Sequence, residues 1–103
     1  MERRSLISAD VLARYAADAA SEVSGVSGLA DGRLGRGKAV SVSGDEDTLA
    51  IELSLELEWG WSSPEVGREV QRRVYEYLER MANVSPASVE VVVGAVSTPP
   101  PGR

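Results

Sequence analysis

The clearest pattern in this chain is a strict alternation between large apolar residues and mostly polar residues from Thr48 to Trp59. The apolar members of the alternation occupy every second position: Leu49, Ile51, Leu53, Leu55, Leu57 and Trp59. Because successive side chains of a β-strand point to opposite faces, this period of two predicts one strand with a buried face and a wet face. Trp59 is therefore predicted to pack in the core, and helices are predicted to cover only one side of the sheet.

Two segments have the apolar spacing of amphipathic helices. The first spans residues 8–23, with Ser8 as its predicted N-cap. The second has Ser63 as its predicted N-cap and Pro64 at its first position, where the missing N–H costs nothing. Its predicted core stripe consists of Val66, Val70, Val74, Tyr77, Leu78 and Met81. Glutamate–arginine pairs four residues apart mark the opposite side of this helix as solvated.

Shorter apolar runs predict two more strands, at residues 38–43 and 88–96, with a turn at residues 44–47. Five glycines between residues 24 and 37 make regular structure costly there, so this segment is predicted to be a loop. The order α-β-β-α-β predicts a two-layer α+β domain, in which a three-stranded mixed sheet carries two helices on one face. We expect residues 1–97 to form this single domain and residues 98–103 to form a flexible proline-rich tail.

Composition narrows the functions open to the chain. Its 103 residues include no cysteine and no histidine, and its formal net charge is −5. Disulfides and thiolate metal sites are excluded, and the commonest general base and metal ligand is missing, so we expect no catalytic, cofactor or metal site and no enzymatic activity. Arg3 and Arg4 precede no apolar signal region, and no run approaches the roughly 20 apolar residues of a membrane span, so we expect a cytoplasmic location.

Several short motifs occur together in one order. They are the opening Leu6-Ile7-Ser8, the segment Glu22-Val23-Ser24-Gly25-Val26, the turn Glu58-Trp59-Gly60-Trp61, the helix start Pro64-Glu65, the helix residues Gln71 and Met81, and the closing run Val89 to Val96. Across residues 6–96 this series resembles the alkaline shock protein family. The chain departs from the family where Ala82-Asn83 replaces the usual Thr-Gly at the end of the second helix.

The resemblance implies a role in envelope stress and homeostasis in Gram-positive bacteria, without an agreed catalytic site. We expect the protein to act through protein–protein association, because the open sheet edges and the wet face offer surfaces for docking or self-association. Some members of the family lie at the inner face of the membrane because a separate membrane-anchoring protein holds them there. A protein partner of that kind, or a second copy of the chain, is therefore expected.

Exposed aromatic and apolar residues are the candidates for a partner-binding surface. Trp61 follows Gly60 at the end of the long strand, and Tyr75 falls opposite the core stripe of the second helix. Val92 and Ala50 are predicted to lie on the wet face of the sheet. Because aromatic side chains are frequent interface anchors, these four residues form the predicted surface for a protein partner or for self-association.

A KH-like RNA-binding module is the alternative function. The glycine-rich segment 25–38 contains the G-x-x-G pattern twice, and its basic residues Arg33, Arg36 and Lys38 could contact a phosphate backbone. However, a KH loop joins two helices, whereas this segment joins a helix to a strand. A phosphate-loop reading of the same segment fails, because Ala39 has no hydroxyl to hold magnesium and the segment opens a strand rather than a helix.

Overall fold

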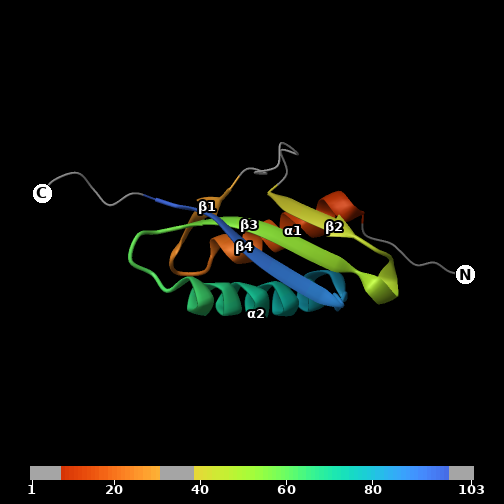
Figure 1. The fold of residues 1–103 in the computed structure, drawn as a ribbon. Helices are drawn as coiled ribbons and strands as arrows, with labels where there is room; N and C mark the ends of the chain where they lie inside the picture. The colour runs from red at the N-terminus through yellow and green to blue at the C-terminus, as the bar shows by residue number, and fades with distance from the viewer. Residues whose placement is uncertain (1–7, 31–38, 98–103) are drawn as a thin grey trace, which may run out of the picture.

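The computed structural model describes residues 8–30 and 39–97, which form one layer of sheet and one layer of helices (Figure 1). The elements in chain order are α1 (Ala9–Ser21), β1 (Val26–Leu29), β2 (Val40–Ser43), a 3-10 turn (Glu46–Thr48), β3 (Ala50–Leu57), α2 (Ser63–Ala82) and β4 (Ser88–Val96). The α+β class is confirmed, and both helices share one core with the sheet.

Strand β3 is the centre of the sheet and pairs along both of its edges. On one edge it runs parallel to β4, from Ala50 beside Ser88 to Leu57 beside Val96, with a bulge after Leu55. The sheet is therefore mixed, as predicted, because the α2 crossover returns the chain in the same direction. Figure 1 shows β4 along this outer edge, with α2 beneath it.

The other edge of β3 carries two strands placed end to end. Strand β1 pairs antiparallel with Leu55 to Leu57, and β2 pairs antiparallel with the segment from Ala50 to Leu53. The junction lies at Ser54, whose carbonyl accepts from the Ala30 N–H at 2.9 Å and whose N–H donates to the Ala39 carbonyl at 2.8 Å. Ala30 and Ala39 therefore bond to the same residue of β3, so β1 and β2 continue one another along this edge.

The prediction of three strands was wrong, because the sheet has four. The missed strand is β1, within the segment predicted to be a loop. Its four residues include Gly28 and show no alternation long enough to detect. Backbone bonds to β3, continued by the Glu58 N–H donating to the Gly25 carbonyl at 2.8 Å, fix it as a strand despite its composition.

The core lies between the sheet and the two helices. The apolar face of β3 is almost fully buried from Leu49 to Leu57, as predicted. Trp59 is not in the core, since 63% of it is exposed: β3 ends at Leu57, and Gly60 turns the chain at a φ of +94° before the alternation can continue. Met81 is also exposed, because α2 ends at Ala82 and Val84 packs against the core in its place.

The helix ends follow capping chemistry. The Ser8 hydroxyl accepts from the Val11 N–H, so the predicted N-cap of α1 is confirmed. The N-cap of α2 is Ser62 rather than Ser63, since the Ser62 hydroxyl accepts from the Glu65 N–H and the helix begins one residue earlier than predicted.

Candidate partner-binding surface

The turn between β3 and α2 presents both tryptophans at one end of the sheet. Trp61 is 48% exposed, and its indole N–H donates to a carboxylate oxygen of Glu58 at 3.2 Å. The ring lies against the backbone of Gly25, so closely that a Cβ there would come within 2.8 Å of the Trp61 Cδ2 atom. Gly25 also has a φ of +96°, which side chains disfavour. A glycine at position 25 therefore permits both the turn after α1 and the close packing of the Trp61 indole against the backbone.

A groove of about 280 Å³ lies beside this indole. Its lining consists of Val23, Ser24, Trp61, Glu65, Val66, Glu69 and Arg73. The residues come from the turn after α1, the turn after β3 and the first half of α2, so three separate segments build it. Val23 and Val66 are buried and provide apolar surface, whereas the charged side chains are at least partly exposed. This volume is at the lower limit for small-molecule sites, and it suits one or two side chains of a partner better than a large cofactor.

Ion pairs hold one wall of the groove. Arg73 contacts Glu69 at 3.3 Å and reaches across to Glu22 at the end of α1, at 3.5 Å. Arg72 contacts Glu69 at 2.6 Å and Glu76 at 2.7 Å. The hydrogen bond from Arg72 lowers the pKa of the Glu69 carboxyl, and the same contact raises the pKa of Arg72. Exposed pairs of this kind contribute little to stability, but together they fix where the charges lie.

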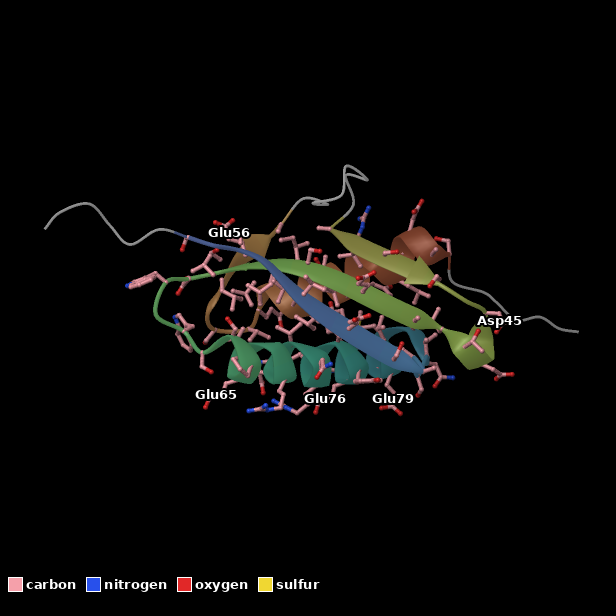
Figure 2. The ribbon with its side chains drawn as sticks, viewed as in Figure 1. Asp45, Glu56, Glu65, Glu76 and Glu79 are labelled. Carbon is pink, nitrogen blue, oxygen red and sulfur yellow. The ribbon has the colours of Figure 1, made fainter. Side chains whose placement is uncertain are left out.

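The open face of the sheet is acidic in the described residues. Glu52 and Glu90 are neighbours across the β3–β4 pairing, and Glu56 lies further along β3 on the same face. All five arginines of the described residues lie on the helices, at Arg14, Arg68, Arg72, Arg73 and Arg80. Figure 2 shows Glu56 at the sheet, and Glu65, Glu76 and Glu79 along the side of α2 that points away from it.

The four residues predicted to form a partner surface do not lie together. Trp61 borders the groove, and Tyr75 lies on the outside of α2, 37% exposed. Val92 and Ala50 lie on the opposite layer, on the open face of the sheet, where Val92 is 38% exposed and Ala50 is half-buried. The basic residues Arg33, Arg36 and Lys38 lie outside the described residues.

Sequence reasoning did not find the rest of the groove. Val66 was assigned to the core stripe alone, and Glu69 and Arg73 to a solvated face. The available signal was Gly25 directly after the first helix, because a glycine there permits the close approach of a bulky side chain from elsewhere in the chain.

The sequence profile of the alkaline shock protein 23 family, described as having a cell envelope-related function, matches residues 2–98. The chain belongs to this family. Among curated proteins, none matches the sequence significantly.

Solved structures share the family member's fold. A variant of MamM-CTD with one histidine changed to alanine superposes with a TM-score of 0.57 at 12% identity, covering 85% of this chain and 98% of the other. A second variant, with histidine changed to glutamate, gives 0.55 at 13% identity, covering 84% and 93%. At this level of identity the likeness concerns the fold alone.

Two residues of α2 and its C-terminal end, Gln71 and Asn83, have clear structural tasks in this family member. The Gln71 amide donates to the Val89 carbonyl at 2.8 Å and ties α2 to β4. Asn83 ends α2 with a φ of +56°. Since asparagine tolerates this left-handed conformation better than most residues, it can serve as the C-cap of the helix.

The described part of this family member lacks two kinds of feature. None of its helices is long and apolar enough to cross a membrane. Nowhere in residues 8–30 and 39–97 do three acidic side chains cluster closely enough to hold a metal ion.

Proposed function

We propose that this chain acts at the cell envelope as a non-catalytic binding protein, which docks a protein partner at the Trp59–Trp61 turn. The observation that supports this most directly is the exposure of two tryptophans on one turn beside a groove. Tryptophan is highly buried on average, and it is the residue most enriched among interface hot spots. The family's cell envelope-related function gives the setting for this binding.

The chemistry of the groove suggests what the partner presents. Val23 and Val66 offer an apolar contact, and Trp61 offers the face of an aromatic ring. Glu58 and Glu65 add negative charge around that ring, while Arg73 is already engaged by Glu22 and Glu69. A segment with an apolar side chain next to a lysine or arginine fits this arrangement, because the cation can approach both the carboxylates and the indole face. We place such a segment on a membrane-anchored protein, with this chain at the inner face of the membrane.

Site-specific photocrosslinking in the native host tests the proposal. A photoreactive phenylalanine analogue at position 59 should give one dominant adduct in the membrane fraction. The same analogue at position 75, on the outside of α2, is the matched control and should not give it. Trp61→Ala should abolish the position-59 adduct, and Tyr75→Ala should leave it unchanged. The same adduct from both positions, or no dependence on Trp61, would refute the assignment of this surface.

No observation on the described residues favours the RNA-binding alternative. Its candidate contacts, Arg33, Arg36 and Lys38, lie outside them. The described open face of the sheet presents Glu52, Glu56 and Glu90, which repel a phosphate backbone.

A further inference from the structure

The outer edge of β4 is a long, mostly apolar strand edge, and within the described residues no element pairs with it. The opposite edge of the sheet differs, because it is divided into β1 and β2 at Ser54. Strand β4 is nine residues long, contains five valines and carries one charged residue, Glu90. Such an edge is a template for another strand unless it is blocked.

The hydrogen bonds show which backbone groups of β4 point outward. The Ser88 N–H donates to the Leu49 carbonyl at 3.3 Å, so Ser88 faces β3. With a period of two, Glu90 and Val92 also direct their N–H and C=O groups to β3, while Val89, Val91 and Val93 direct theirs away. The Val89 carbonyl confirms this, because it accepts from the Gln71 side chain at 2.8 Å instead of from β3.

This edge is partly blocked at both ends. Gln71 occupies the Val89 carbonyl at one end, and the bulge in the β3–β4 pairing after Val93 disturbs the ladder at the other. The outward N–H and C=O groups of Val91 and Val93 remain in between. The edge therefore fits a short partner strand that forms its hydrogen bonds at these two residues.

We propose that the partner strand is β4 of a second copy, paired antiparallel about a two-fold axis at Val92. In this register Val91 of each copy lies opposite Val93 of the other, and each such pair exchanges two backbone hydrogen bonds. All the outward groups of Val91 and Val93 are then used, and the Gln71 bond to Val89 is kept. The two-fold relation makes one surface complementary to itself, as isologous dimers require.

The side chains agree with the same register. Val92 meets Val92 of the second copy, where Cα atoms of a non-hydrogen-bonded pair are about 4.5 Å apart. Glu90 lies opposite Gly94 of the second copy, so no carboxylate faces another. The two Glu90 residues are offset by four positions, or about 13 Å at 3.3 Å per residue, which exceeds the screening length of about 8 Å in physiological salt.

Helix α2 gives independent support. A two-fold axis perpendicular to the sheet keeps the helices of both copies on one face, so the two α2 helices run side by side. Gly67 lies on α2 beside Val91, and a Cβ there would meet only Val91 Cγ1, at the ordinary contact distance of 3.9 Å. The fold of a single copy therefore does not require glycine at this helical position, and the missing Cβ leaves room for a second helix to approach.

A charge-swap at the axis tests the proposal, because residue 92 meets only its own counterpart. Analytical ultracentrifugation from about 1 µM to 1 mM should show a reversible dimer of the unmodified chain. Val92→Glu and Val92→Lys should each weaken self-association at least tenfold, and an equimolar mixture of the two should restore it. Far-UV circular dichroism checks that each variant is folded. We expect both variants to fold, because Val92 is exposed and a charged side chain at this position can reach solvent.

Two proline variants test the edge itself. Val93→Pro removes an outward N–H from each copy, hence two hydrogen bonds per dimer, and should weaken the dimer about thirtyfold. Val42→Pro is the matched control, since the Ser54–Ala39 bond and the β2–β3 register direct the Val42 N–H outward on the opposite edge. This control variant should leave the dissociation constant of the dimer unchanged within about threefold.

Amide hydrogen exchange gives a readout independent of any variant. Val91 and Val93 should gain protection as concentration rises, while Glu90 and Val92 should be protected throughout. A monomer across the whole concentration range, or a mixture of the charge variants that fails to associate, would overturn the proposal. Trp61→Ala should leave the dimer intact while removing the photocrosslink, so failure of this proposal is distinguishable from failure of the proposed function.

Discussion

Replacing Gly25 with alanine tests how the Trp61 indole is held at the groove. The substitution acts in two ways that the structure separates. A φ of +96° costs a residue with a Cβ about 1–2 kcal/mol. In addition, the new Cβ would lie 2.8 Å from Trp61 Cδ2, so the ring must move. Moving it strains the 3.2 Å hydrogen bond to Glu58, which is worth about 1 kcal/mol.

The sum predicts that Gly25→Ala lowers the free energy of unfolding by about 2–3 kcal/mol. Urea unfolding followed by far-UV circular dichroism is the suitable assay, because tryptophan fluorescence would itself change when the indole moves or is removed. The decisive comparison is a double-mutant cycle with Trp61→Ala. Without the indole only the backbone cost remains, so Gly25→Ala should then cost about 1–2 kcal/mol.

The coupling of about 1 kcal/mol is the part of the result that depends on the contact. If Gly25→Ala lowers the free energy of unfolding equally with and without Trp61, the ring does not pack on Gly25, and the described position of the indole is incorrect. If the coupling is found, Gly25→Ala should also weaken the photocrosslink from position 59. The ring would then remain in the chain but lie in a different place beside the groove.

Three further substitutions test other features of the structure. Gly67→Ala should raise the free energy of unfolding by about 0.5–1 kcal/mol in dilute solution, measured by urea unfolding, since the added Cβ meets only Val91 at 3.9 Å; a destabilised protein would contradict this. Asn83→Ala should lower stability by about 1 kcal/mol and Asn83→Gly should not, because the C-cap has a φ of +56°; equal effects on the thermal midpoint would count against the left-handed cap. Glu69 has a pKa below its ordinary value of 4.5 because Arg72 donates to it, so its contribution to stability is present above that value and lost as pH falls through the folded pKa. Glu69→Gln should therefore make unfolding free energy fall less steeply on acidification below about pH 4.5, and an unchanged slope would argue against the ion pair.

The sequence was informative where a periodic pattern lay on one element. The alternation from Leu49 to Leu57 predicted the buried face of β3, and the valines of α2 predicted its packing side. Prediction failed where tertiary contacts decided the outcome. Strand β1 exists because β3 offers it backbone partners, and Trp59 leaves the core because the strand stops two residues earlier. Neither fact is encoded in local propensity.

The candidate site shows the same division. Trp61 was identified from its position after a strand and a glycine, both of which are local signals. The groove beside it depends on the end of α1 meeting the start of α2, 40 or more residues later, and no local pattern predicts that meeting. Trp61, Tyr75 and Val92 lie on different surfaces for the same reason. Periodicity predicts which side chains are exposed, but it does not predict which exposed side chains lie next to one another.

The positions of the two proposed surfaces explain how one small domain could bind a partner and itself at once. The tryptophan turn lies at one end of β3, whereas the centre of the β4 edge lies at Val92, beside Ser54 in the middle of that strand. A two-fold axis at Val92 places the two tryptophan turns at opposite ends of the paired sheet, because antiparallel pairing reverses the strand direction. Each dimer would then present two separate partner sites. If the partner is anchored in the membrane, two-point attachment raises the effective affinity without any new contact, provided that both sites face the bilayer. Loss of self-association in the Val92 charge variants should therefore reduce membrane retention even though the tryptophan turn is intact, and co-expression of the two variants should restore it.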